Sequence, residues 1–360
     1  MLRYPIYAQW ILPDSMSSIK EPERGNLPGG FMTEDRCNEI KWAVLGTGVI
    51  ANEMAKALQK SGKKLFAVGN RTHSKAVAFA EKYGVEKVYS DFNEMFTDPD
   101  VDAVYITTPH NTHIGFMRRA IEGGKHILVE KSITLNSSEL QEAVALAEKN
   151  NVIIGEAMTI YHMPIYRKLK EIIDSGELGK VNLITMNFGS FKEYDMSNRF
   201  FSRDLAGGAM LDIGVYALSL IRWFMKPDPD KMITDVRLAP TGVDEKVTML
   251  LSNEEGQMAT VALSMHSKQP KRAMISCEKA YIEIMEYPRA WEARITDAVS
   301  GEVRKVSIGD NADALRYELE DFEAAVRNED NSLHLDYTID VMELMTKARR
   351  EWGMTYPEEE

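Results

Sequence analysis

Cysteine is scarce in this chain of 360 residues, which contains only Cys37 and Cys277. The two lie far apart and in no CxxC or Cys/His spacing, so we expect neither a disulfide framework nor a zinc site. Long apolar runs are also missing, because the longest, residues 213–225, contains Arg222 and is too short to span a bilayer. The sequence therefore favours a cytoplasmic protein with no membrane partner.

Positive charge is in deficit as well. The 43 Lys and Arg residues are outnumbered by 55 Asp and Glu residues, which gives a formal net charge of -12. Such a surface disfavours nucleic acid and anionic membranes, so a small molecule is the expected partner. The composition, 44% hydrophobic and 27% charged, is ordinary for a globular protein, and the length favours two domains over one.

The N-terminal residues carry no recognisable export signal. They show one early basic residue and a short apolar patch interrupted by Pro5, without the apolar core and small-residue cleavage site of a signal peptide. Their Pro and Gly content favours an N-terminal arm or extension over residues 1–38. The alternative is that Met32 is the natural start.

Residues 39–157 alternate short apolar runs with amphipathic stretches, which predicts a doubly wound parallel sheet of the Rossmann type. We expect strands at 41–45, 65–68, 103–106, 126–129 and 152–154, and helices at 51–59, 74–83, 113–122 and 137–148. From residue 158 to 360, successive strand-like runs without crossover helices predict an α+β domain with a mainly antiparallel sheet. Its expected strands are 181–188, 247–251, 259–264, 280–285 and 293–295, and its expected helices are 164–175, 211–224, 312–327 and 337–352.

The first strand leads into a G-x-G-x-x-A fingerprint that opens the first helix. In this context the first glycine allows a tight turn, the second lets the backbone approach a pyrophosphate, and Ala51 permits close packing of the helix. The alternative is a tight strand-helix turn without a ligand. We expect these residues to bind a dinucleotide: Gly46, Thr47, Gly48, Val49 and Ile50.

The second strand ends at Asn70 and Arg71, where an enzyme that uses NAD usually carries Asp or Glu for the ribose hydroxyls. The acid is missing and a guanidinium stands beside its position, which favours the 2′-phosphate of NADP. NAD stays possible, because Arg71 also fits a role in stacking on adenine or in solvent.

Two further segments fall at the carboxyl ends of predicted strands, the edge where open α/β sheets bind ligands. One contains Thr108, Pro109, His110 and His113, and Asn111 or Thr112 in the same segment also suits a helix N-cap. Neither histidine has metal-ligand spacing, so no metal site is expected, and both suit structural roles. The other segment is Glu130-Lys131, for which a salt bridge and a cofactor or catalytic role are alternatives.

Downstream, Asp212 and Tyr216 lie four residues apart on one face of an otherwise apolar predicted helix. A lysine, an aspartate and a tyrosine that converge near a nicotinamide make a proton relay, because the ammonium lowers the pKa of the phenol. The alternative is that Asp212 caps the helix and Tyr216 packs in the core.

These motifs together resemble the glucose-fructose oxidoreductase/inositol dehydrogenase/MocA (Gfo/Idh/MocA) family, over about residues 40–357. The match rests on the fingerprint, on Thr108-Pro109 with His113, on Glu130-Lys131, and on Gly207-Gly208 followed by Asp212 and Tyr216. The tyrosine and the ending at residues 350–357 are most similar to the dihydrodiol dehydrogenase and glucose-fructose oxidoreductase branch.

The resemblance implies a Rossmann domain followed by a domain whose open sheet forms the interface of a homo-oligomer, a dimer or a tetramer. It implies that Lys131 is the catalytic lysine, Tyr216 the general acid/base, and Asp212 a residue that orients the substrate or the lysine. The implied reaction is hydride transfer between nicotinamide and a sugar, polyol or glycoside. There are two alternatives: an enzyme that acts on a trans-dihydrodiol, and a non-catalytic regulator that senses the cofactor.

The sequence departs from the family pattern at two places. Ser132 stands where the family usually has proline, so the backbone φ after Lys131 is not locked. Tyr161 stands where many relatives place an arginine, which puts a substrate contact at that position in doubt. Arg199 or Arg203, in the loop before Gly207, are alternative sources of a substrate-binding cation, or they form loop salt bridges.

Overall fold

The computed structural model describes residues 39–330 and 332–360. The predicted arm, residues 1–38, lies outside the described residues together with Cys37 and the alternative start at Met32. All helices, strands and contacts reported below belong to the described part of the chain.

Six parallel strands form the first sheet, in the order β3-β2-β1-β4-β5-β6. This order reverses direction between β1 and β4, which creates the switch point where doubly wound folds bind dinucleotides. The predicted Rossmann sheet is confirmed. The strands are β1 (Trp42–Leu45), β2 (Ala67–Gly69), β3 (Lys87–Tyr89), β4 (Ala103–Ile106), β5 (His126–Glu130) and β6 (Ile154–Ala157).

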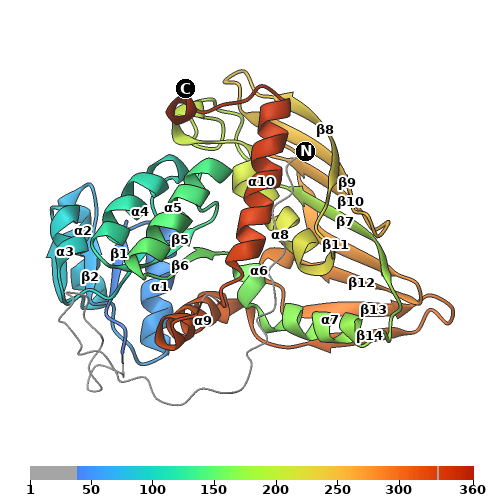
Figure 1. The fold of residues 1–360 in the computed structure, drawn as a ribbon, viewed down its shortest axis with the longest axis horizontal. Helices are drawn as coiled ribbons and strands as arrows, with labels where there is room; N and C mark the ends of the chain where they lie inside the picture. Colours follow the sequence, from blue (N-terminus) through green and yellow to red (C-terminus); the bar gives the residue numbers. More distant parts are fainter. Residues whose placement is uncertain (1–38, 331) are drawn as a thin grey trace, which may run out of the picture. The chain divides into compact units, whose positions relative to one another are not determined.

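Helices cover both faces of this sheet (Figure 1). The first face packs against α1 (Val49–Lys60), α2 (His73–Tyr83) and α9 (Ala314–Asn328). The second face packs against α3 (Phe92–Thr97), α4 (His113–Glu122) and α5 (Ser137–Asn150).

Helix α9 comes from the far end of the sequence, yet it joins the core of the first sheet. The rings of Trp42 in β1 and Phe322 in α9 lie 5.1 Å apart between centroids, and the indole Nε1 of Trp42 donates to Glu323. Residues 40–360 form one compact unit. The predicted boundary at residues 157 and 158 therefore stays a prediction, and α9 crosses it in space.

Eight strands form the second sheet, in the order β14-β13-β12-β11-β7-β10-β9-β8. Neighbouring strands are antiparallel, as predicted, except that β7 and β10 are parallel. The strands are β7 (Val181–Gly189), β8 (Lys231–Leu238), β9 (Asp244–Ser252), β10 (Met258–Ser264), β11 (Gln269–Cys277), β12 (Ala280–Met285), β13 (Glu292–Asp297) and β14 (Val303–Ser307).

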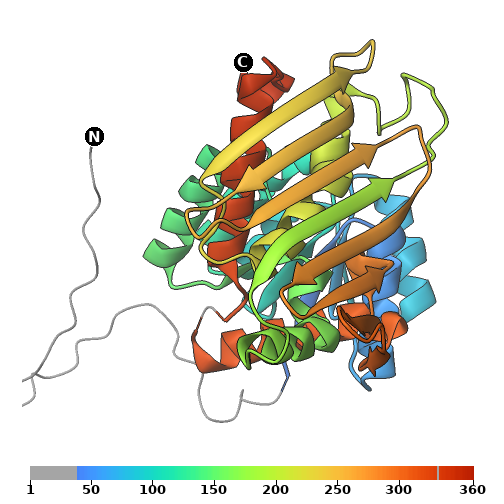
Figure 2. The ribbon, with the colours of Figure 1, turned by 90° about the vertical axis from the view of Figure 1, so that its right-hand side faces the viewer.

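The other helices connect the two sheets or pack against the second one, and the second sheet has an open face (Figure 2). They are α6 (Thr159–His162), α7 (Pro164–Asp174), α8 (Val215–Phe224) and α10 (Leu335–Glu351). Short helical turns are η2 (His110–Thr112), η3 (Arg203–Leu205), η4 (Met210–Gly214, of the π type), η5 (Tyr287–Arg289), η6 (Asn311–Asp313) and η7 (Pro357–Glu359).

Within the described residues, one helical stretch, Arg203–Phe224, has the length and mean hydropathy, 1.4, of a membrane span. Of its most apolar window, 78% is buried inside the protein, and α8 within it contacts both β7 and α10. The apolar composition of this stretch is therefore accounted for by core packing.

Candidate active site

The turn between β1 and α1 has the shape that a pyrophosphate requires. Gly46 adopts a φ of +111°, and a Cβ added there would lie 2.6 Å from Oγ1 of Thr107, so only glycine fits. Gly48 is the N-cap of α1 without a side-chain cap, and a Cβ added there would meet nothing within 4 Å. The space beside the backbone at this helix start is therefore open, and the helix dipole favours an anion there.

Asn52, which the sequence analysis did not select, braces the same turn. Its Nδ2 donates to the carbonyl oxygens of Gly48 (2.8 Å) and Thr47 (3.2 Å), while its Oδ1 accepts from the hydroxyl of Tyr83 (2.7 Å). An asparagine in the first turn of a helix is a common sequence feature, so its pattern gave no signal for this role.

Asn70 and Arg71, which were predicted to lie beside the ribose of the cofactor, follow β2. Asn70 fixes the local backbone, because its Nδ2 donates to the carbonyl of Thr72 at 3.0 Å. Arg71 is exposed, and its guanidinium forms no ion pair with any carboxylate of the described residues. Among residues 39–330 and 332–360, therefore, no carboxylate competes with a bound phosphate for Arg71.

The two histidines after β4 hold the backbone around Lys131. The ring of His113 is fully buried, with Nε2 2.8 Å from the carbonyl of Thr108 and Nδ1 3.1 Å from the carbonyl of Ser132. Nε2 of His110 lies 3.0 Å from the carbonyl of Lys131, and burial and the nearby lysine lower the pKa of His110 to about 3. The contacts of both histidines fit the structural roles considered above. His113 is fully buried, whereas the predicted contact of His110 with the cofactor stays a prediction.

Lys131, Asp212 and Tyr216 converge, although they come from separate parts of the sequence. Nζ of Lys131, at the tip of β5, donates to the carbonyl of Asp212 at 2.7 Å and lies 3.4 Å from Oδ1 of Asp212. The same ammonium lies 5.1 Å from the centre of the Tyr216 ring in α8. Tyr216 is partly exposed, and its hydroxyl has no hydrogen-bond partner among the described residues.

The three groups set each other's charge. Burial raises the pKa of Tyr216 to about 12, and Lys131 opposes that rise. Burial works against the charge of Lys131, but Asp212, Tyr216 and Glu130 raise its pKa overall. Burial likewise disfavours the Asp212 carboxylate, but Lys131 and Arg199 lower its pKa overall. At neutral pH the site therefore holds an ammonium, a carboxylate and a protonated phenol.

The turn that carries Asp212 is a π-type turn, and such turns widen the helix and change its hydrogen bonds. Two residues of the β5 loop bond to its carbonyl groups: Lys131 to Asp212, and the buried Ser132 hydroxyl to Leu211 at 3.0 Å. The Lys131-Ser132 peptide bond is cis. Through its hydroxyl, Ser132 joins the strand tip at Lys131 directly to the turn of Asp212.

Glu130 points back into the protein, where it accepts a hydrogen bond from the hydroxyl of Tyr105. Burial raises the pKa of Glu130. Its predicted contact with the cofactor stays a prediction, whereas its contact with Tyr105 connects β4 to β5 beside the site.

The candidate substrate residues divide into two groups. Arg199 lies beside the site, with Nη2 3.9 Å from Oδ1 of Asp212 and 60% of its side chain exposed. Tyr161 is fully buried and stacks on Trp223 at 5.9 Å, so core packing leaves it no surface for the predicted substrate contact. Arg203 donates to the carbonyl of Thr355 and forms a salt bridge with Glu360, which fits the alternative of a loop salt bridge rather than a substrate contact.

Lys192 is a further cation at the site that the sequence analysis missed. It adds to the charges that hold the Asp212 carboxyl ionised, and its Nζ lies 3.9 Å from the centre of the Phe200 ring. Its sequence neighbourhood, a loop after β7, offers no motif that predicts such a position.

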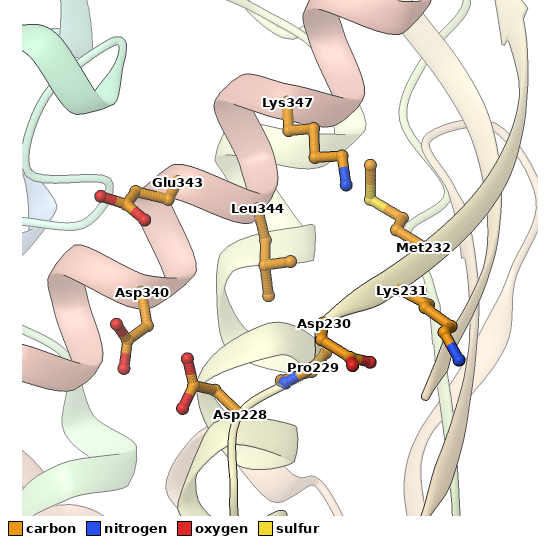
Figure 3. Close-up of a pocket in the computed structure, with 9 residues that line it drawn as sticks. All are labelled: Asp228, Pro229, Asp230, Lys231, Met232, Asp340, Glu343, Leu344 and Lys347. Carbon is orange, nitrogen blue, oxygen red and sulfur yellow. The ribbon is translucent and has the colours of Figure 1, made fainter. Parts of the chain in front are cut away.

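A separate pocket of about 170 Å³ lies between the start of β8 and α10 (Figure 3). Acidic side chains (Asp228, Asp230, Asp340 and Glu343) outnumber the two lysines that line it. None of its lining residues is a predicted site residue. Within the described residues, no group of three His, Cys, Asp or Glu side chains is placed to hold a metal ion.

Comparison with known families and relatives matches nearly the whole described chain. Residues 40–158 match the "Oxidoreductase family, NAD-binding Rossmann fold", and residues 166–283 match the "GFO/IDH/MocA C-terminal domain". The trans-1,2-dihydrobenzene-1,2-diol dehydrogenase of Xenopus tropicalis is 27% identical over 88% of this chain and 99% of its own length. The enzyme of that name from Mus musculus is 28% identical over 89% and 99%.

Solved structures share the fold. A 3-ketoreductase from Actinomadura kijaniata, in complex with NADP and TDP-benzene, has a TM-score of 0.77 at 21% identity, over 87% of this chain and 98% of its own. A levoglucosan dehydrogenase in complex with NADH and levoglucosan has a TM-score of 0.77 at 18% identity, over 87% and 96%.

Proposed function

This chain belongs to the Gfo/Idh/MocA family of NAD-binding oxidoreductases, and on that premise we propose that it transfers a hydride between a nicotinamide and a secondary alcohol or carbonyl of a sugar, polyol or glycoside. The observation that carries the proposal is the convergence of Lys131, Asp212 and Tyr216 at the carboxyl edge of a Rossmann sheet. The open turn at Gly46 and Gly48 in the same sheet suits the pyrophosphate of the cofactor.

The chain's own residues supply the proton chemistry. The nicotinamide, when bound, gives or takes the hydride. In the direction of reduction, the Tyr216 hydroxyl donates its proton to the substrate oxygen, and in oxidation it takes that proton back. The ammonium of Lys131 stabilises the phenolate that remains, and Asp212 keeps Lys131 charged and in place.

The test is absorbance at the reduced-nicotinamide band with a panel of sugars, polyols and glycosides and their carbonyl counterparts. The proposal requires a substrate-dependent change in at least one direction. Cofactor that binds but is never converted would instead support the alternative of a cofactor-sensing regulator.

A trans-dihydrodiol is the second candidate substrate. It is favoured by the two relatives described above, which bear that activity in their names and align over nearly their full length. The same absorbance assay decides between the classes, provided that trans-dihydrobenzenediol is included with the sugar panel. Faster turnover of the dihydrodiol than of every sugar would replace the sugar proposal.

We propose NADP as the preferred cofactor, because Arg71 is exposed and not paired with a described carboxylate. Arg71→Ala should weaken NADP binding by about tenfold to a hundredfold, the value of a charge-assisted hydrogen bond to a phosphate. Binding of NAD, which lacks that phosphate, serves as the internal control and should stay unchanged. Fluorescence titration with both cofactors measures the effect, and equal values for NADP in the variant and the wild type would contradict it.

We also propose that the open face of the second sheet joins two copies of this chain. Cross-strand rows place apolar side chains side by side on it, because Ile233 pairs with Leu250, and Met258 pairs with Leu183. All four are exposed, by 73%, 40%, 43% and 38%. Exposed apolar side chains that cluster in this way often mark a protein–protein contact.

A charge placed on that face should separate the copies. Leu250→Lys is expected to lower the mass measured by sedimentation velocity to that of a single chain, while Val299→Lys, at a 96% exposed position in the turn between β13 and β14, should leave it unchanged. A wild-type protein that sediments as a single chain would contradict the proposal.

A further inference from the structure

We propose that residues 354–360 are a positioning element of the active site, in which Tyr356 and Glu359 hold the loops that present Lys131 and Asp212. The proposal rests on the proposed function for its catalytic consequence. Its structural part stands on contacts within the described chain, none of which involves the reacting groups themselves.

The carboxylate of Glu359 is the centre of this element. It accepts two hydrogen bonds from the buried guanidinium of Arg349 (2.7 and 2.9 Å), and a third from the backbone N–H of Tyr356 (2.8 Å). It also accepts from Nδ2 of Asn136 (2.9 Å), while Arg349 donates to the carbonyl of Leu135. Because residues 131–136 form one loop, Glu359 and Arg349 fix the loop that begins at Lys131.

Tyr356 reaches the second catalytic segment. Its side chain is fully buried, and its hydroxyl donates to the carbonyl of Gly207 at 2.6 Å. The next residue, Gly208, has a φ of +119°, and a Cβ added there would lie 2.1 Å from Oδ1 of Asp244. The other oxygen of Asp244 accepts from the N–H of Met210 at 2.6 Å. The turn that leads to Asp212 is therefore held between Tyr356 on one side and Asp244 on the other.

The same segment touches the third loop at this edge. Nδ2 of Asn111, in the loop after β4, donates to Oε1 of Glu358 at 2.6 Å. Nε of Arg203, just before the Gly207 turn, donates to the carbonyl of Thr355 at 2.8 Å. Three loops from distant parts of the sequence thus meet on one short segment.

Such contacts matter for catalysis because the distance from Lys131 to Asp212 depends on how the β5 loop sits against the Gly207 turn. Small displacements of reacting groups cost on the order of a hundredfold in rate. Since Tyr356 and Glu359 act through the backbone of other residues, they are positioning residues rather than catalytic ones.

The test compares Tyr356→Phe, which removes one hydroxyl and keeps the ring, with Tyr166→Phe. Tyr166 is the matched control, because its buried hydroxyl also donates to a backbone carbonyl, that of Tyr287, outside the three loops. Amide hydrogen exchange of the full-length protein is followed by mass spectrometry for peptides that cover residues 131–136 and 203–214. Steady-state kcat, KM and cofactor affinity are measured at a temperature well below the melting temperature of each variant.

In Tyr356→Phe we expect faster exchange across residues 203–214 and a fall in kcat of about tenfold or more, with cofactor affinity unchanged. Glu359→Gln should extend the faster exchange to residues 131–136. Unchanged exchange in both variants would overturn the proposal, and so would a lower melting temperature with wild-type kcat, which indicates a structural role alone. The hydrogen-exchange measurement does not need a substrate. A wild-type protein without turnover would therefore contradict the proposed function, and the exchange rates of the variants would still decide whether residues 354–360 hold the two loops.

Discussion

Lys131→Met should lower kcat by about a thousandfold while cofactor affinity stays close to that of the wild type. The ammonium donates to the carbonyl of Asp212 at 2.7 Å and lies 5.1 Å from the ring of Tyr216, so its loss removes the charge that stabilises the phenolate. Losses of this size are typical when a charged or hydrogen-bonding group that stabilises a developing anion is removed. Single-turnover absorbance at the reduced-nicotinamide band and fluorescence titration of the cofactor measure the two effects.

Lys192→Met is the matched control for that experiment. Lys192 also contributes to the charge around Asp212, but its ammonium lies against the Phe200 ring and forms no hydrogen bond with Asp212 among the described residues. Its removal should change kcat by much less than the removal of Lys131. Near-normal turnover of Lys131→Met, with the protein folded, would contradict the assigned role of Lys131.

Tyr216→Phe should lower kcat by about a hundredfold to ten-thousandfold, the range for loss of a general acid/base. The fold should tolerate this change, because the hydroxyl has no hydrogen-bond partner among the described residues. The matched control is Tyr281→Phe, at an exposed position on the open face of the second sheet. Equal turnover of Tyr216→Phe and the control would contradict the role of the phenol.

The pH dependence of kcat/KM provides an independent check on Tyr216. Burial raises the pKa of Tyr216 to about 12, so the phenol is protonated throughout the usual assay range. Oxidation needs the phenolate, so kcat/KM for oxidation should rise with pH. Below pH 12 the rise should be about tenfold for each pH unit. Reduction needs the protonated form and should stay level over the same range. Tyr216→Phe should abolish the slope in the direction of oxidation.

Much of the first sheet was predictable from the sequence, because buried parallel strands are continuous apolar runs separated by long amphipathic helices. The strand Ala103–Ile106 and the helix His113–Glu122 match their predicted ranges. The strand Lys87–Tyr89 and the helix Phe92–Thr97 were missed, because elements this short carry no clear periodicity.

The second sheet was less accessible to prediction. The strands Lys231–Leu238 and Gln269–Cys277 are rich in charged and polar residues, and the latter contains Pro270, so neither resembles a buried strand. The parallel pairing of β7 with β10 was not predicted either, because successive strands without crossover helices suggest antiparallel pairing. Nothing local in the sequence indicates that α9 returns to pack on Trp42.

The candidate site shows the same division. The place of Lys131 after an apolar strand predicted its position at the ligand edge of the sheet, while its catalytic role was implied only by the resemblance to the family. Neither the π-type turn nor the contact of Lys131 with the carbonyl of Asp212 was predicted, because both depend on tertiary packing. Tyr161 was a candidate only because of its position in the family pattern, and its burial against Trp223 is a long-range feature.

The central claim is that this chain itself transfers the hydride at the site of Lys131 and Tyr216. Its most direct test is to incubate the wild-type protein and Lys131→Met with NADPH deuterated at the transferred C4 position and a panel of carbonyl sugars, and then to weigh the products. We predict that one deuterium appears at the new carbinol carbon with the wild type and that almost none appears with Lys131→Met. Deuterium that enters the product equally with both proteins, or cofactor that binds and never loses its label, would contradict the account.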